Sequence, residues 1–269
     1  VVGGNVAMYC ILYLTLSLYE GVIYMKNTVI YVHGKGGSAE EAEHYKSLFP
    51  ASEVIGFDYR SGTPWDAKEE FPHFFDELRS RCDSLTLIAN SIGAFFSMSA
   101  LGEKTVDKAL FISPVVDMEK LIGDMMTWAN VTERELEEKS EIATSFGETL
   151  SWRYLCYVRE HPIKWNVPTN ILYGEHDNLT SLETISAFAK KIGAPFTVMP
   201  GGEHWFHTEE QMRFLEGWIE KSGKVCFKTH NGKNVPLKFT ALRIKSLQQL
   251  KRANCAYLVL ISTYGIMTI

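Results

Sequence analysis

The chain has 269 residues, of which 46% are hydrophobic and 22% are charged, and this composition is typical of a folded globular protein rather than a disordered one. Its net charge of −5 is unevenly divided, because residues 25–220 contain 18 Lys and Arg against 31 Asp and Glu, whereas residues 221–269 contain nine Lys and Arg and no acid. The acidic body argues against nucleic-acid binding, which requires a basic face to neutralise phosphates. The five cysteines are widely spaced without a C-x-x-C pair, so we expect neither a disulfide framework nor a zinc site, and a cytoplasmic location.

Two segments differ from the body of the chain. Residues 1–24 contain an apolar run, Val6 to Tyr19, that is shorter than the ~20 residues of a membrane helix and has no preceding Lys or Arg of a secretory signal. We therefore expect no membrane insertion. Residues 25–220 are interpreted as the working domain, with 1–24 and 221–269 as flanks that lie outside it.

From Thr28 onward, short β-branched apolar runs alternate with amphipathic stretches, which predicts an α/β fold with a mostly parallel sheet and helices on both faces. Six strands are expected, at residues 28–33, 53–58, 84–90, 108–113, 169–174 and 196–199. Helices are expected at about 40–48, 73–81, 92–101, 181–192 and 209–220.

Two helix starts carry the S/T-x-x-E/Q pattern of a capping box, namely Thr180 with Glu183 and Thr208 with Gln211. The alternation is broken at residues 114–166, a long insertion rich in helix-forming residues. An excursion of this length is usually a lid or a binding element. We therefore expect a helical cap there.

The most specific motif is LTLIANSIGAFF, in which a strand runs into a helix with Ser91 at the junction. In a nucleophile elbow the serine lies on a strained turn, so the residues two before and two after it must be small. Here they are Ala89, where glycine is usual, and Gly93. Ser91 is therefore the candidate nucleophile, the alternative being a serine that merely caps a helix.

An oxyanion pocket can be assembled beside this serine. HGKGGS (33–38) follows the first strand, and an N–H of this loop together with the N–H of Ile92 can stabilise a tetrahedral oxyanion. By position, the loop donor is Lys35. The glycine patterns of nucleotide-binding loops are absent from the sequence, so nucleotide binding has little support.

An acid and a base follow the last two strands. Asp177, in YGEHDNLTS, is the candidate acid that orients a histidine, with Glu175 and Asp117 as competitors. His204, in MPGGEHWFH, is the candidate base, and His207 is interpreted as a bystander. The chain order Ser91, Asp177, His204, each in a loop after a strand, is the order that α/β-hydrolases use.

On these motifs the chain resembles a small α/β-hydrolase with a helical cap over about residues 25–220. The resemblance implies a Ser-His-Asp hydrolase that needs no cofactor or metal and acts on a small-molecule ester through an acyl-enzyme. The insertion at 114–166, which we expect to lie over the carboxyl ends of the strands, favours a small apolar acyl pocket and therefore short acyl chains. The same residues would serve a thioesterase or an acyltransferase, and the fold also occurs in proteins that bind ligands without turnover. Aromatic residues at helical spacing are more often core than binding wall, and we expect Trp205, Trp128 and Trp152 to include those that contact the substrate.

Overall fold

The computed structural model describes residues 26–101 and 105–223, together with the backbone of four short strands that follow. The chain divides into two compact units, Val1–Ile219 and Glu220–Ile269. In the second unit, β9 (Cys226–Lys228) pairs antiparallel with β10 (Asn234–Pro236), and β11 (Val259–Ser262) pairs antiparallel with β12 (Gly265–Thr268). The predicted flank at 1–24 lies outside the described residues.

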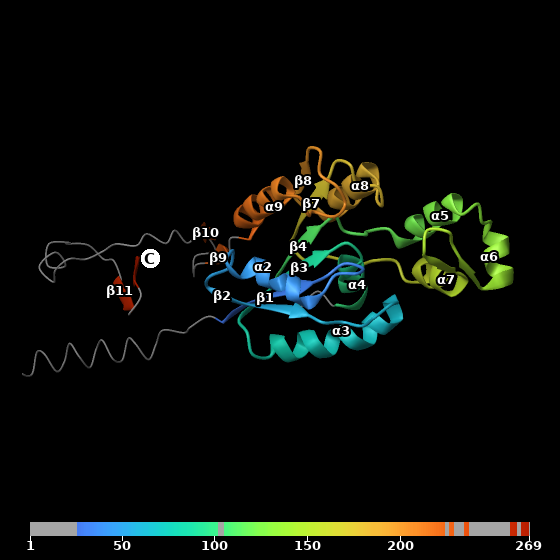
Figure 1. The fold of residues 1–269 in the computed structure, drawn as a ribbon. Coiled ribbons are helices and arrows are strands. Elements are labelled where there is room, and N and C mark those ends of the chain that lie inside the picture. The colour runs from blue at the N-terminus through green and yellow to red at the C-terminus, as the bar shows by residue number, and fades with distance from the viewer. Residues whose placement is uncertain are drawn as a thin grey trace, which may run out of the picture. The chain divides into compact units, whose positions relative to one another are not determined.

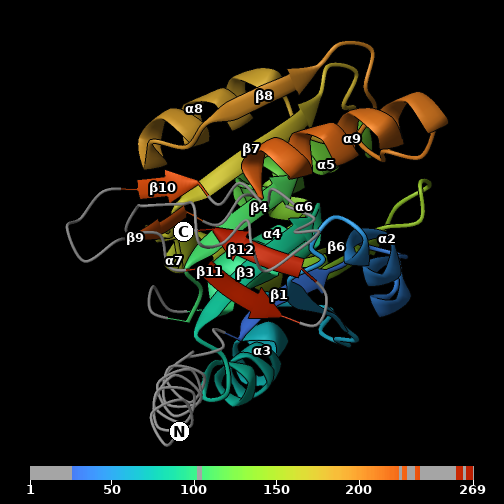
Figure 2. The ribbon, with the colours of Figure 1, turned by 90° about the vertical axis from the view of Figure 1, so that its left-hand side faces the viewer.

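The first unit is built on a six-stranded parallel sheet, as predicted. Its inner strands are buried on both faces, which is why they are continuous apolar runs rather than alternating ones. Figure 2 shows the strands following one another across the sheet. In sheet order they are β2 (Ser52–Phe57), β1 (Asn27–Val32), β3 (Ser84–Asn90), β4 (Lys108–Ile112), β7 (Thr169–Gly174) and β8 (Phe196–Met199).

Helices cover both faces of this sheet (Figure 1). One face packs against α3 (Pro64–Arg79), α4 (Ile92–Ala100) and α8 (Leu182–Ile192). The other face packs against α9 (Glu209–Ser222) and the short pair formed by the 3₁₀ turn η1 (Ala39–Ala42) and α2 (Glu43–Lys46). Alternate side chains of each strand enter the two cores, as with Ile30 and Tyr31 of β1.

One predicted helix start and one predicted helix cap are wrong. Helix α3 begins at Pro64, nine residues before the predicted start at 73, because Thr63 caps it by accepting a hydrogen bond from Asp66 N and the helix continues through Pro72. Helix α8 is capped by Ser181, whose hydroxyl accepts from Thr184 N, and not by Thr180. The second capping box is confirmed, since Gln211 N donates to Thr208 Oγ1 and Thr208 N donates to Gln211 Oε1.

Between β4 and β7 the chain leaves the sheet and forms a small subdomain, here called the cap. Its helices are α5 (Met118–Trp128), α6 (Glu133–Lys139) and α7 (Trp152–Glu160), and Figure 1 shows them gathered at one end of the sheet. An antiparallel hairpin of β5 (Glu141–Ala143) and β6 (Thr149–Ser151), which was not predicted, completes it. Buried Leu136, Leu150 and Leu155 give the cap a core continuous with that of the sheet.

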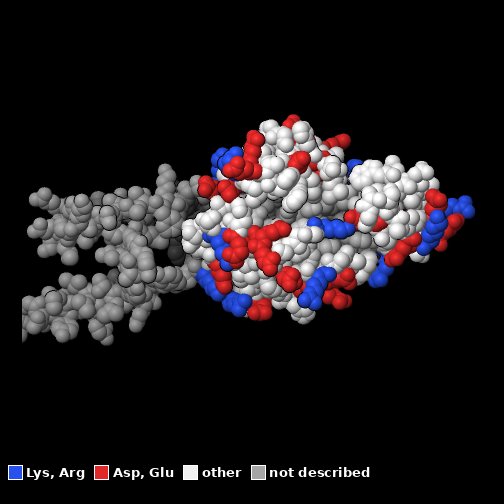
Figure 3. Space-filling model, viewed as in Figure 1, with Lys and Arg blue, Asp and Glu red and all other residues white. Residues whose placement is uncertain are grey.

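The surface of the described part carries charges of both signs. Figure 3 shows Asp and Glu scattered over one face with Lys and Arg between them. None of the helices in residues 26–101 and 105–223 is long and apolar enough to cross a membrane.

Candidate active site

Ser91 lies at the sharp turn between β3 and α4, in a conformation that few side chains adopt. Its φ of 52° and ψ of −121° lie outside the ordinary regions, and Ser91 N donates to Ile112 O of the neighbouring strand at 3.0 Å. A strained backbone of this kind persists only where the surroundings impose it, and it is a common feature of functional sites. The turn lifts the Ser91 hydroxyl to the carboxyl edge of the sheet.

Small residues are required on both sides of this turn. A Cβ on Gly93 would lie 2.3 Å from His33 O and 2.9 Å from Val32 O, so no larger residue fits without displacing the loop after β1. Ala89, at the position where the elbow pattern usually has glycine, is fully buried in β3. The alanine that replaces the usual glycine therefore fits within the buried strand β3.

Three side chains from three loops form a linear hydrogen-bonded array at this edge. Ser91 Oγ lies 2.8 Å from His204 Nε2, and His204 Nδ1 lies 2.6 Å from Asp177 Oδ2. Ser91 is only 9% exposed and the Asp177 side chain is fully buried. The structure thus brings together the three residues that the sequence singled out, although they are up to 113 positions apart.

The Asp177 carboxylate is fixed by its own loop. Its Oδ1 accepts from Leu179 N at 2.8 Å and from Thr180 N at 3.0 Å, and its Oδ2, which faces the histidine, also accepts from Thr180 Oγ1 at 3.4 Å. Tyr173 OH donates to Thr180 O at 2.8 Å, and burial raises the pKa of Tyr173. The Thr180 hydroxyl is thus used to hold Asp177, while Ser181 caps α8.

The histidine loop and the aspartate loop are tied to each other. His176 N donates to Gly202 O at 2.7 Å, and Gly201 N donates to Glu175 Oε2 at 2.8 Å. A Cβ on Gly174 would lie 2.3 Å from Glu203 O, so the close approach of the two loops depends on that glycine. Glu175, a competitor for the acid role in the sequence, instead holds the histidine loop.

The remaining competitors lie elsewhere. Asp117 caps α5, where its Oδ1 accepts from Lys120 N at 2.9 Å. His207 is exposed and stacks on Trp205 at 4.7 Å, with its Nδ1 2.8 Å from Trp205 O. Neither forms a hydrogen bond or an ion pair with Ser91 or His204 among the residues that the structure describes.

Of the two candidate oxyanion donors, Ile92 follows Ser91 directly, and Lys35 follows Gly34, where a Cβ would lie 3.1 Å from Ser91 Cβ. Ile92 is the first residue of α4, so its N–H has no acceptor within the helix. Lys35 lies in the turn after β1, which is closed by a hydrogen bond from Gly37 N to Gly34 O. Tyr59 OH donates to His33 O at 2.9 Å and its ring stacks on His33 at 4.3 Å, so Tyr59 braces the start of the same loop.

The Lys35 side chain reaches the cap. Its ammonium group forms a bidentate ion pair with Glu148, which directly precedes β6 in the β5–β6 hairpin. The hairpin holds Glu148 firmly, since Thr144 N donates to Glu148 O at 2.7 Å. Neither Glu148 nor Tyr59 was predicted from the sequence. Tyr59 follows β2, so its position at the carboxyl edge of the sheet could have indicated a role near the site. Nothing in the sequence links Glu148 to Lys35.

The three tryptophans proposed for substrate contact occupy different environments. Trp205, beside His204, is 68% exposed, and Trp128 is 53% exposed and meets Phe146 edge to face at 6.1 Å. Trp152 is partly buried and packs against the main core. No group of three or more His, Cys, Asp or Glu side chains with the arrangement of a metal site occurs in the described ranges 26–101 and 105–223.

Comparison with solved structures identifies the fold. The chain is similar to α/β hydrolase domain-containing protein 10 from mouse (TM-score 0.60, 15% identity, 72% of this chain and 88% of that chain covered). It is also similar to Est1E from Butyrivibrio proteoclasticus (TM-score 0.58, 16% identity, 75% and 88% covered) and to a soluble variant of the monoglyceride lipase from Saccharomyces cerevisiae (0.51, 12%, 73% and 86%). No protein-family model and no curated protein sequence matches the chain. At these identities the similarity shows a common fold, that of the α/β-hydrolases.

Proposed function

We propose that this chain, which has the α/β-hydrolase fold, is a serine hydrolase that cleaves carboxylic esters of small molecules, with a preference for short acyl groups, through an acyl-enzyme. The observation that carries the proposal is the array Ser91 Oγ, His204 Nε2, His204 Nδ1, Asp177 Oδ2, with separations of 2.8 Å and 2.6 Å. A buried carboxylate on one ring nitrogen and a hydroxyl on the other are what a general base needs to activate a serine.

In the acylation step, Ser91 Oγ attacks the ester carbonyl carbon while its proton passes to His204 Nε2. The imidazolium that forms is stabilised by the buried Asp177 carboxylate. The carbonyl oxygen becomes an oxyanion, and we assign its stabilisation to the N–H groups of Lys35 and Ile92. When the carbon–oxygen bond to the leaving group breaks, His204 returns the proton to the departing alcohol.

Deacylation repeats these steps with water. His204 Nε2 takes a proton from the water that attacks the acyl carbon, and the proton then returns to Ser91 Oγ as the carboxylic acid leaves. No cofactor takes part in either half of this scheme. The ester class is favoured by the serine array and agrees with the identity of one structural neighbour, a monoglyceride lipase.

Substrate contacts are assigned by position. Trp205 follows His204 and presents most of its ring to solvent, so we assign it to the leaving-group side of the site. Trp128 and Trp152 belong to the cap, where they are candidates for contact with the acyl group.

The proposal is tested by kinetics on p-nitrophenyl butyrate with matched serine and histidine variants. We expect Ser91→Ala and His204→Ala to lower kcat by several orders of magnitude, since each removes a member of the array. His207→Ala is the control, because His207 is a nearby exposed histidine that contacts neither Ser91 nor Asp177 in the described structure, and it should stay within about threefold of wild type. A larger loss in His207→Ala than in His204→Ala would contradict the assignment of the base.

A further inference from the structure

A cavity of about 310 Å³, open to solvent, is lined by the second half of α4, whereas Ser91 lies at the start of that helix. It is formed where α3 and α4 of the sheet domain meet α7 of the cap and the segment that follows α7. None of its lining residues belongs to the array. Ser99, one of them, lies eight residues after Ser91 on α4, which at ~1.5 Å per residue places it ~12 Å along the helix.

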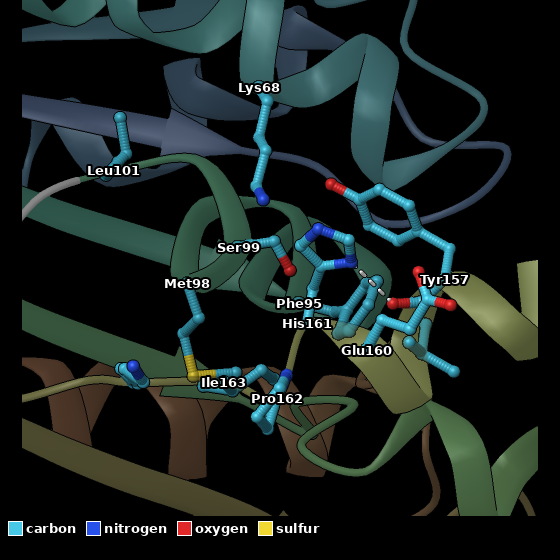
Figure 4. A pocket seen from close by; sticks show the side chains of 12 residues that line it. Lys68, Phe95, Met98, Ser99, Leu101, Tyr157, Glu160, His161, Pro162 and Ile163 are labelled. Carbon is cyan, nitrogen blue, oxygen red and sulfur yellow. Dashed lines mark hydrogen bonds between the residues drawn. The ribbon is translucent and has the colours of Figure 1, made fainter.

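Three polar groups, from α3, from α4 and from the residue that follows α7, converge at one end of this cavity. Figure 4 shows the Lys68 ammonium group of α3 pointing toward Ser99 of α4 and His161 at the end of α7. Lys68 lies over the Tyr157 ring at 5.3 Å, and no carboxylate is within ion-pair distance of it among residues 26–101 and 105–223. A cation held in this way by an aromatic face keeps its charge available for a ligand.

The imidazole of His161 is also held in place. Its ring stacks on Tyr157 at 4.1 Å and its Nδ1 lies 2.9 Å from Tyr157 O. One ring nitrogen is therefore used by the backbone, and the other remains for the cavity. Ser99 adds a hydroxyl that can both donate and accept.

The other end of the cavity is apolar. Figure 4 shows Met98, Pro162 and Ile163 on the side opposite Lys68. The charged residues on the wall are two lysines, Lys68 and Lys164, against one glutamate, Glu160. The wall of the cavity therefore carries one more positive than negative side chain and has an apolar end, within a domain that is strongly acidic overall.

We propose that this cavity binds a small amphiphilic carboxylate, that is, the anion of a carboxylic acid with a short apolar chain. Its carboxylate accepts hydrogen bonds from Lys68 and Ser99, and its chain lies on Met98 and Ile163. A single negative charge suits the site better than a phosphate dianion, because Glu160 offsets part of the positive charge. The volume is at the lower end of that of ligand pockets, which limits the ligand to a small molecule.

Such a ligand would touch the sheet domain and the cap at once. Lys68 and Ser99 belong to α3 and α4, whereas Ile163 belongs to the segment by which the cap returns to β7. Binding would therefore add a contact between these parts. The inference goes beyond the proposed hydrolysis and does not depend on it, because binding is measured without turnover.

The test is calorimetric titration of the full chain with hexanoate, and with 1-hexanol as the uncharged probe of the same chain length. We expect hexanoate to bind and 1-hexanol to bind at least tenfold more weakly. Lys68→Met should weaken hexanoate binding about tenfold or more, since it removes a charged hydrogen-bond donor. Lys68→Arg should retain binding, and Ser99→Ala should weaken it several-fold.

A control variant makes the result specific. Lys190→Met removes an exposed lysine of α8 that does not line the cavity, and it should leave the affinity unchanged. Only the binding that Lys68→Met weakens is assigned to this cavity, because Lys68 does not belong to the catalytic array. The thermal unfolding midpoint of each variant shows whether it is folded.

Three outcomes would overturn the proposal. The first is an absence of hexanoate binding by the folded wild-type chain, and the second is an affinity that Lys68→Met and Ser99→Ala leave unchanged. The third is tighter binding of inorganic phosphate than of hexanoate, which would show that the site recognises a compact dianion instead. None of these outcomes bears on whether Ser91 is a nucleophile.

Discussion

Replacing Asp177 by asparagine should reverse the hydrogen bond that orients the histidine. Asp177 Oδ1 accepts two backbone N–H groups, at 2.8 Å and 3.0 Å, so the asparagine must place its carbonyl oxygen there. Its NH₂ group then occupies the Oδ2 position, 2.6 Å from His204 Nδ1 in the wild type, and donates to that nitrogen. The ring proton is forced onto Nε2, which can no longer accept the proton of Ser91.

The expected loss is about 10⁴-fold in kcat, as found for the same change of tautomer in serine proteases. At 1.36 kcal/mol per factor of ten, this corresponds to about 5 kcal/mol of transition-state stabilisation. Because the two backbone hydrogen bonds to Oδ1 are kept, we expect the unfolding midpoint to change by only a few degrees. The assay is release of p-nitrophenol from p-nitrophenyl butyrate by the full chain.

Asp117→Asn is the matched control. Asp117 caps α5 through a bond from Lys120 N, and asparagine caps a helix about as well as aspartate. Activity within about twofold of wild type is therefore expected, since nothing in the catalytic array changes. The reasoning is refuted if Asp177→Asn, while folded, keeps more than about a tenth of the wild-type kcat, or if Asp117→Asn is the more damaging change.

Further predictions concern the elbow, the flanks and the substrate. Gly93→Ala would place a methyl group 2.3 Å from His33 O, so we expect a loss of about 1–3 kcal/mol in the free energy of unfolding together with lower kcat/KM; thermal melts at wild-type values would contradict the close contact. A chain of residues 25–223, which keeps α9 whole to Ser222, should fold and hydrolyse p-nitrophenyl butyrate at the rate of the full chain; if it is insoluble while the full chain is active, the flanks are structural. Esters with acyl groups of about two to six carbons should have higher kcat/KM than those with twelve to sixteen, because each methylene that fits contributes at most ~0.8 kcal/mol and a filled site excludes more; equal or faster cleavage of the long esters would indicate an open groove.

The sheet could be predicted because burial decides where its strands occur. Each predicted strand matches the observed one to within a residue at either end, since apolar β-branched runs that are buried on both faces leave little choice. Helix boundaries were less predictable. Pro72 suggests a break, yet α3 passes through it, and Thr180 has the spacing of a helix cap but holds Asp177 instead.

The candidate array could be located because the carboxyl ends of parallel strands meet at one edge of the sheet. Ser91, Asp177 and His204 each follow a strand, so the sheet alone brings them near one another. Contacts made by the cap could not be predicted in this way. The ion pair between Lys35 and Glu148 joins positions 113 residues apart through a hairpin that has no signal in the sequence.

The most direct test of the central claim is covalent labelling of the folded full chain with a fluorophosphonate, followed by mass spectrometry of its peptides. This reagent captures serines that a neighbouring base has activated. We predict that the label is found on Ser91, in near-stoichiometric amount, and that His204→Ala abolishes it while His207→Ala does not. An unlabelled Ser91 in the folded chain, or a label on a different serine, would contradict the assignment of Ser91 as the nucleophile.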